Sequence, residues 1–252
     1  MSCAIPTWPV AKREVKLVGR RWLGALEELV ELSSRYPLSA LIGRAGMGKT
    51  QVLYALCERV PCIYIDATEL PERSLAYVAA VVAWRLAVQN RAAKSKIVDI
   101  HRRYGFQGLL ALAQGDPSWT LSAALDLAPG RLVVALDEWM PSTDDPQFFQ
   151  AASALHRIRN MGLDRAGFVV SFLPEVYEKL ASRVPPLGNI LASVSVQLPD
   201  VLDERDVEEI ISAFCPDKVK AALSWLKSRP DSTVRELLMA LSSTKELEVP
   251  IE

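Results

Sequence analysis

The chain has 252 residues, half of them hydrophobic, and a formal net charge of −1. This length supplies enough apolar material for one α/β core with a small appendage. Apolar runs stay too short to cross a bilayer and the first residues lack an apolar signal region, so we expect a cytoplasmic protein without membrane contact. The near-neutral charge and a pI of about 6.2 argue against a strong free-standing DNA-binding protein.

Cysteine and histidine usage gives no sign of a metal cluster. Cys3, Cys57, Cys62 and Cys215 form no C-x-x-C pair and have no histidine at ligand spacing, so we expect small buried hydrophobic residues. The sequence is also poor in asparagine, a thermolabile amide, which favours a thermophilic source.

The first predicted elements are a helix and a strand. Trp22, Leu26, Leu29 and Val30 recur at helical spacing, and the apolar run 38–42 follows as a strand. Directly after it, residues 43–50 read GRAGMGKT, a complete G-x-x-x-x-G-K-[ST] phosphate-binding loop. Glycines let the backbone N–H groups turn inward around a phosphate, and the next helix adds its positive N-terminal dipole.

This loop predicts a nucleotide site. Lys49 is expected to reach the β- and γ-phosphates and to act in catalysis, and the Thr50 hydroxyl is expected to hold Mg²⁺. The residues predicted to contact the nucleotide are Gly43, Ala45, Gly46, Met47, Gly48, Lys49, Thr50 and Gln51.

A second strand is predicted over 62–66, followed by a helix from Ser74 to Asn90. Between this strand and the next, residues 85–103 carry a basic cluster in a predicted helix and loop. Its members are Arg85, Arg91, Lys94, Lys96, Arg102 and Arg103. The cluster is interpreted either as a phosphate-gripping DNA site or as the solvated face of a helix.

The third predicted strand, 132–136, ends in the carboxylates Asp137 and Glu138. Such a pair at a strand end often lies in solvent, but after a phosphate loop it indicates a Walker B motif. Asp137 would then bind the magnesium through water, and Glu138 would orient and polarise the attacking water. The chain has no Asn-Lys-x-Asp element for guanine, so ATP and ADP are the expected nucleotides.

The remaining elements complete an α/β pattern. A helix from an Asp145 N-cap to Arg159, a strand over 167–171, a helix from Pro174 to about Ser182 and a strand over 192–198 are predicted. The alternation predicts a five-stranded, mainly parallel sheet between helices. We divide the chain into a P-loop core, 1–200, and an acidic helical lid, 201–252. The lid has three helices, one capped by Asp203, one opened by Pro216 and one starting near 231–232.

The motif order resembles that of the AAA+ ATPases. The resemblance is carried by Val18-Gly19-Arg20, GRAGMGKT, YIDA at 64–67 and VVALDE at 133–138. Within the family the chain is similar to the archaeal ATPase and STAND group and to the branch of initiators and transposition regulators. The resemblance implies an ATPase that assembles into a homo-oligomer with ATP. The initiators also place a DNA-contacting insertion in the interval that holds the basic cluster.

The resemblance implies roles for five further residues. Val18 and Gly19 would lie against the adenine. Ser171 matches the sensor-1 position, which helps to place the attacking water, and Arg235 matches the sensor-2 arginine that touches the γ-phosphate. Arg183 stands where an arginine finger would reach a neighbouring subunit's nucleotide. Ordinary surface arginines are the alternative for Arg183 and Arg235.

Three functions are compatible with these motifs. The first is an ATP-dependent oligomeric switch that acts on DNA in initiation, loading or transposition. The second is a STAND-like signalling or remodelling ATPase whose partner is another protein. The third, a small-molecule kinase, is disfavoured by Glu138 directly after Asp137 and by an acidic lid that lacks the arginines of kinase lids.

Overall fold

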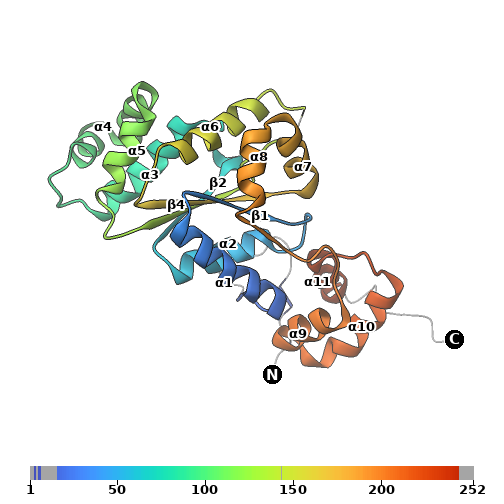
Figure 1. Ribbon diagram of the computed structural model, residues 1–252. Coiled ribbons are helices and arrows are strands. Elements are labelled where there is room, and N and C mark those ends of the chain that lie inside the picture. Colours follow the sequence, from blue (N-terminus) through green and yellow to red (C-terminus); the bar gives the residue numbers. More distant parts are fainter. Residues whose placement is uncertain (1–2, 4, 7–15, 143, 244–252) are drawn as a thin grey trace.

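Five parallel strands form the centre of the molecule, which we describe from a computed structural model covering residues 3, 5–6, 16–142 and 144–243. The strands lie in the order β2-β3-β4-β1-β5, and every neighbouring pair is parallel (Figure 1). This arrangement confirms the predicted sheet and sets β4 between β1 and β3. The strands are β1 (Leu38–Ile42), β2 (Cys62–Asp66), β3 (Leu132–Asp137), β4 (Ala166–Phe172) and β5 (Ser195–Gln197).

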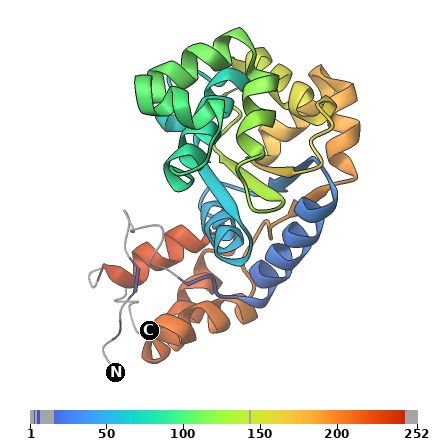
Figure 2. The same cartoon turned by 90° about the vertical axis from the view of Figure 1, so that its left-hand side faces the viewer.

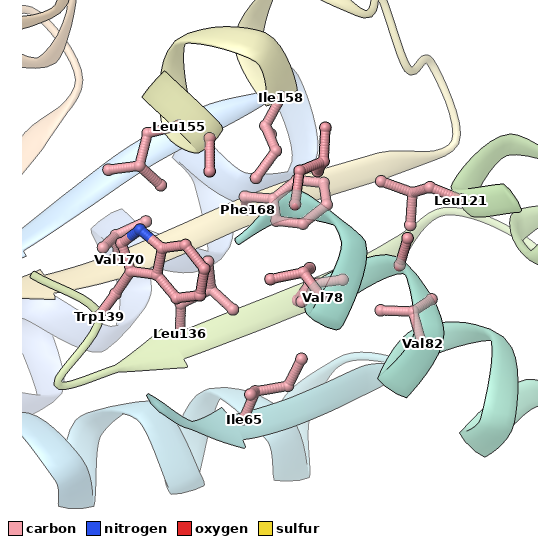
Figure 3. Close-up of a cluster of buried hydrophobic side chains, with 14 of the residues drawn as sticks. Ile65, Val78, Val82, Leu121, Leu136, Trp139, Leu155, Ile158, Phe168 and Val170 are labelled. Carbon is pink, nitrogen blue, oxygen red and sulfur yellow. The ribbon is translucent and has the colours of Figure 1, made fainter. Parts of the chain in front are cut away.

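Helices cover both faces of the sheet because alternate strand residues enter two separate cores. Helices α1 (Arg20–Arg35) and α2 (Lys49–Arg59) pack on one face, against residues such as Val133 and Ala135. Helices α3 (Leu75–Gln89), α6 (Phe148–Asn160), α7 (Pro174–Arg183) and α8 (Pro185–Ala192) cover the other. Figure 3 shows this second core, where Leu136 and Phe168 of the sheet meet Val78 and Leu155 of the helices.

Two further helices fill the interval between β2 and β3. After a short 3-10 turn, η1 (Ala67–Glu69), and α3, the chain forms α4 (Lys96–Gly115), kinked at Gly105, and α5 (Pro117–Leu125). Both pack against α3. In two perpendicular views they lie at the end of the molecule away from the lid (Figures 1 and 2). The sequence predicted only a helix and a loop here.

In the part of the chain described, the segment predicted as a lid, which we continue to call the lid, contains α9 (Glu204–Phe214), α10 (Val219–Ser228) and α11 (Val234–Ser242). Asp203 caps α9 as predicted, and its side chain and that of Asp206 form a reciprocal capping box. Thr233 and Glu236 form the same motif on α11. Pro216 opens a 3-10 turn, η2 (Pro216–Lys218), so the second lid helix begins only at Val219. The α9 and α11 apolar residues join the core beneath α1 and α2.

Several boundaries differ from the sequence prediction. The Asp145 side chain accepts from the Gln147 backbone in a local turn, so α6 begins at Phe148 rather than after Asp145. Strand β5 spans three residues rather than seven. Helix α8 was not predicted, although Pro185 at its first position suits a helix start.

The cysteines differ from the expectation of small buried hydrophobic residues. They form two disulfides, Cys3–Cys215 and Cys57–Cys62. Only Cys215 is fully buried, whereas Cys57 and Cys62 are half-buried where α2 turns into β2. Across the part of the chain described, no helix combines the length and the apolar character that crossing a membrane requires.

Candidate nucleotide site

The glycine loop joins β1 to α2, and α2 begins at Lys49 inside the motif. Gly46 and Gly48 have φ values of 79° and 89°, a left-handed backbone that favours glycine. Space is also restricted, because a Cβ on Gly46 would lie 2.8 Å from the Thr233 hydroxyl of the lid. Glycine at position 46 therefore serves both the turn and the contact between loop and lid.

Trp22 of α1 contacts the glycine loop through a hydrogen bond. It is 2% exposed, and its indole Nε1 donates to the Met47 carbonyl at 2.7 Å. Sequence reasoning placed Trp22 only on the apolar face of a helix. No sequence signal distinguishes a tryptophan that packs in a core from one that also bonds a loop carbonyl.

Lys49 lies 8% exposed within the loop. Its Nζ donates to the Gly43 carbonyl at 2.7 Å and to the Arg44 carbonyl at 3.2 Å. Burial lowers the pKa of Lys49, and the nearby carboxylates of Glu138 and Asp137 oppose that shift. The ammonium group is thus held by two backbone oxygens at the start of the glycine loop.

Asp137 connects the carboxylate strand to the loop. The Thr50 hydroxyl donates to Asp137 Oδ2 at 2.7 Å, so the two residues predicted to hold one metal ion are in direct contact. Tyr64 also donates to Oδ2, at 2.8 Å, and Ser171 donates to Oδ1 at 2.6 Å. The carboxylate is 1% exposed, and these three hydroxyl groups satisfy it.

Glu138 turns away from the strand into solvent. It is the only non-glycine residue in the described chain with a positive φ, 51°, a conformation that costs on the order of 1 kcal/mol and concentrates at functional sites. Its backbone N–H donates to Ser171 Oγ at 3.2 Å. Ser171 therefore bonds both Asp137 and the peptide of Glu138, which fixes the direction in which the Glu138 side chain leaves β3.

A cavity of about 420 Å³ opens between the loop, the carboxylates and the lid. Arg235 of α11 lines it, and the Arg235 backbone N–H donates to the Gly46 carbonyl at 3.1 Å. The full lining is Pro6, Ala45, Gly46, Gly48, Lys49, Thr50, Gln51, Asp137, Glu138, Leu173, Val234, Arg235, Leu238 and Met239. The apolar members from the lid were not singled out by the sequence.

Six of the residues predicted for the nucleotide site lie outside this lining. Two of them, Met47 and Ser171, are buried and contact Trp22 and Asp137 as described above. Val18 packs in the core shared with the lid, and Gly19 precedes α1 next to Trp22 and Ile210. Gly43 directly follows β1, and its carbonyl accepts a hydrogen bond from Lys49. Arg183 is exposed at the end of α7, with its guanidinium 5.7 Å from the centre of the Phe148 ring.

The basic cluster lies on α3, α4 and the loop between them, at the end of the molecule away from the lid (Figures 1 and 2), and none of its residues lines the cavity. All six side chains are exposed. Arg102 donates to the Arg91 carbonyl and pairs with Asp99 at 3.6 Å, and Lys96 lies 4.8 Å from the Trp119 ring centre. The structure therefore does not bring the cluster to the nucleotide site.

The oxygen atoms of Thr50 and Asp137 are hard ligands of the kind that Mg²⁺ prefers. A magnesium ion bound with a triphosphate needs only one or two protein oxygens, since phosphates and waters supply the rest. In the described regions, no group of three or more His, Cys, Asp or Glu residues could hold a metal by itself.

Solved structures of replication initiators resemble this architecture. The Orc1 protein of Aeropyrum pernix in complex with DNA aligns with a TM-score of 0.57 and 18% identity, covering 92% of this chain and 63% of that one. A DNA replication initiation factor aligns with a TM-score of 0.51 and 15% identity, covering 94% of this chain and 64% of that one. The chain has the AAA+ P-loop ATPase fold.

The replication initiator DnaA bound to AMPPCP and single-stranded DNA gives a TM-score of 0.51 at 16% identity, covering 92% of this chain and 63% of that one. The chain thus spans less than two thirds of each of these initiators. No family model and no curated protein matches the sequence. The likeness therefore rests on the arrangement of the elements.

Proposed function

We propose that the chain binds ATP with Mg²⁺ and hydrolyses it to ADP and phosphate. The observation that carries this proposal is the convergence of Lys49, Thr50, Asp137, Glu138 and Arg235 on one cavity. These residues come from the loop, the end of β3 and the lid, which are far apart in the sequence. A buried lysine beside two carboxylates and a glycine turn is a setting suited to a charged phosphate chain and its metal.

The loop would bind the triphosphate through its backbone N–H groups. Lys49 would exchange its bonds to the Gly43 and Arg44 carbonyls for phosphate oxygens, so a buried cation gains a charged partner. Thr50 and Asp137 would hold the magnesium, which neutralises charge developing on the β- and γ-phosphates. Arg235 would add a positive charge from the lid.

Glu138 is the proposed general base. It would accept a proton from a water molecule whose oxygen attacks the γ-phosphorus, while the bond to the β–γ bridging oxygen breaks and ADP leaves. Ser171 would act by holding Asp137 Oδ1 and the Glu138 peptide in place. The geometry thus favours a supporting role for Ser171 through these two residues.

The nucleotide base is proposed to be adenine. Leu238, Met239 and Val234 give one side of the cavity an apolar surface. Gln51 lines the same cavity, and its side-chain oxygen Oε1 is buried without a hydrogen-bond partner among the described residues. A lone buried acceptor suits the exocyclic amine of adenine, because an unsatisfied buried carbonyl is costly.

We further propose that ATP binding drives assembly of a homo-oligomer that acts on DNA. Initiators of the same fold have been solved with DNA, and the exposed basic cluster supplies the positive charge that phosphates attract. An oligomer that repeats a small basic patch binds DNA more tightly than one subunit does, without any new kind of contact. Arg183 is proposed to reach the neighbouring subunit's nucleotide.

A second candidate is a switch whose partner is a protein. The observation that favours it is a cleft of about 880 Å³ beside the edge strand β2, outside the nucleotide cavity. Its lining contains the aromatic rings of Tyr54, Tyr64, Tyr77, Trp84 and Phe106. Aromatic side chains in a cleft are typical of protein contact sites.

Replacement of the proposed base tests the ATPase. Glu138→Gln should bind ATP with a dissociation constant within about threefold of the wild type, yet its steady-state phosphate release should fall about 100-fold or more. Glu178→Gln, an exposed glutamate on α7 outside the cavity lining, is the matched control and should leave both values unchanged. Wild-type turnover in Glu138→Gln would remove Glu138 as the base.

A further inference from the structure

Asp137 has three hydroxyl donors, and the proposed mechanism uses only two of them. Thr50 and Ser171 belong to positions with expected roles, whereas Tyr64 belongs to the neighbouring strand β2. A carboxylate has about four lone-pair positions. Thr50 and Tyr64 occupy Oδ2, and Ser171 with the Glu138 backbone N–H at 3.2 Å occupies Oδ1. Tyr64 thus completes the set of contacts that fixes this carboxylate.

The strand register explains how Tyr64 reaches Asp137. Tyr64 pairs with Ala135 of β3, and Asp137 lies two residues further along the same face. Ile63 and Ile65 alternate to the other face, where Ile65 enters the core with α3 (Figure 3). The long tyrosine side chain therefore spans one step diagonally along the sheet, on the face that carries α2.

Helix α2 holds the same carboxylate by two routes. Thr50 in its first turn bonds Asp137 Oδ2 directly. Tyr54 lies four residues later, on the same side of the helix, and stacks on Tyr64 with 4.3 Å between ring centres and 25° between ring planes. Thr50, Tyr54, Tyr64 and Asp137 therefore form a closed ring of contacts that ties the helix after the glycine loop to the carboxylate strand.

We propose that Tyr64 is a positioning residue that orients Asp137 for the magnesium ion. This inference rests on the proposed ATPase function and adds a residue to it. Tyr64 donates its hydroxyl hydrogen to the oxygen that Thr50 also bonds. It would keep the carboxylate in place when Thr50 exchanges its bond for the metal, so that the lone pair released by Thr50 faces the metal and its water. Partners of this kind behind a metal-binding carboxylate typically change metal affinity or activity by about 10- to 100-fold when removed.

The Tyr64 hydroxyl keeps its proton over the whole neutral range. Burial and the adjacent charge of Asp137 raise the pKa of Tyr64 well above its usual value. The Tyr64 hydroxyl therefore stays a hydrogen-bond donor to the carboxylate.

The test is the dependence of Tyr64→Phe on magnesium concentration. This change keeps the ring, and with it the stacking on Tyr54, and removes only the hydroxyl. We expect the Mg²⁺ concentration that gives half-maximal ATP hydrolysis to rise about tenfold. Binding of ADP measured by calorimetry without magnesium should stay within about twofold, since the metal does not take part. Tyr177→Phe is the matched control, because that hydroxyl bonds Ser195 on β5 instead.

The outcomes separate the two proposals. If the wild type hydrolyses ATP and Tyr64→Phe needs the same magnesium concentration, the proposed role of Tyr64 is overturned. The proposed ATPase function is then unaffected. A wild type that shows no magnesium-dependent nucleotide binding overturns both. A purely structural role predicts a lower melting temperature with the magnesium requirement of the wild type. If Tyr64→Phe does not fold, Tyr54→Leu, which removes the stacking partner, should shift the magnesium requirement in the same direction by a smaller factor.

Discussion

The nucleotide cavity and the basic cluster both gather charged side chains, but they hold them differently. In the cavity, Asp137 and Lys49 are buried and each has at least two hydrogen bonds that fix its direction. In the basic cluster, every side chain is exposed, and the contacts that are present run to neighbours such as Asp99 and Trp119. The first arrangement suits one ligand shape, whereas the second supplies a general positive field.

This difference predicts how each region responds to mutation. In the cavity, one substitution should abolish ATP binding or hydrolysis, because hydrogen bonds hold the buried groups in one arrangement. In the cluster, several charges should contribute similar small amounts, so only combined changes should be visible.

The largest effect is expected for Lys49→Ala. Removing a buried cation from a charged ligand costs on the order of 3 kcal/mol, or about 100-fold in affinity. We therefore expect the ATP dissociation constant, measured by calorimetry, to rise by about that factor. Lys220→Ala, an exposed lysine on the lid, is the control. Equal ATP affinity in Lys49→Ala and wild type would contradict the phosphate-binding role of the loop.

An intermediate effect is expected for the double change Lys94→Glu and Arg103→Glu. Affinity for duplex DNA at low salt, with a slowly hydrolysed ATP analogue, should fall about tenfold, because two phosphate contacts turn repulsive. Turnover of ATP without DNA should stay within about twofold, since neither residue lines the cavity.

The matched control for this double change is Arg205→Glu with Lys220→Glu on the lid. Sedimentation with ADP or with the analogue, with and without duplex DNA, would measure assembly in parallel. If duplex DNA does not change the sedimentation of the wild type, the result would favour a protein as the partner instead of DNA.

The smallest effect is expected for Thr233→Ala. Thr233 accepts from the Glu236 backbone as the N-cap of α11, and losing such a cap costs about 1 kcal/mol in the free energy of unfolding. Urea denaturation should detect it, with Ser34→Ala as a control whose exposed hydroxyl bonds only its own helix.

This difference in stability should also depend on pH. The backbone N–H and the hydroxyl of Thr233 both lower the pKa of Glu236, and Thr233→Ala removes only the bond from the hydroxyl. The contribution of that bond is present above the ordinary pKa of a glutamate and is lost as the pH falls through the lowered pKa. A difference between Thr233→Ala and wild type that stays constant into the acid range would exclude a contribution from the bond between the Thr233 hydroxyl and the Glu236 carboxylate.

The features predicted from sequence are those carried by contiguous motifs. The glycine loop, the β3 carboxylates and the sheet could be read directly because their residues are neighbours in the chain. The contact between Thr50 and Asp137 followed from combining two motifs on parallel strands, whose carboxyl ends share one edge.

Features that depend on strand register, or on packing between residues far apart in the sequence, could not be predicted from the sequence. Tyr64 reaches Asp137 only because β2 and β3 pair with Tyr64 beside Ala135. The start of α6 was misplaced because Asp145 forms a turn with Gln147, which competes with its use as a helix cap. The pairing of Cys3 with Cys215 joins two residues with a sequence separation of 212, and no spacing rule reveals it.

The bond between the Trp22 indole and the Met47 carbonyl has a practical consequence. Any rearrangement of the glycine loop changes the electrical surroundings of a buried fluorophore, so the near-ultraviolet emission of Trp22 should follow the loop in real time without an added dye. A variant in which the other tryptophans are replaced by phenylalanine would isolate that signal and make the kinetics of loop movement visible by stopped flow.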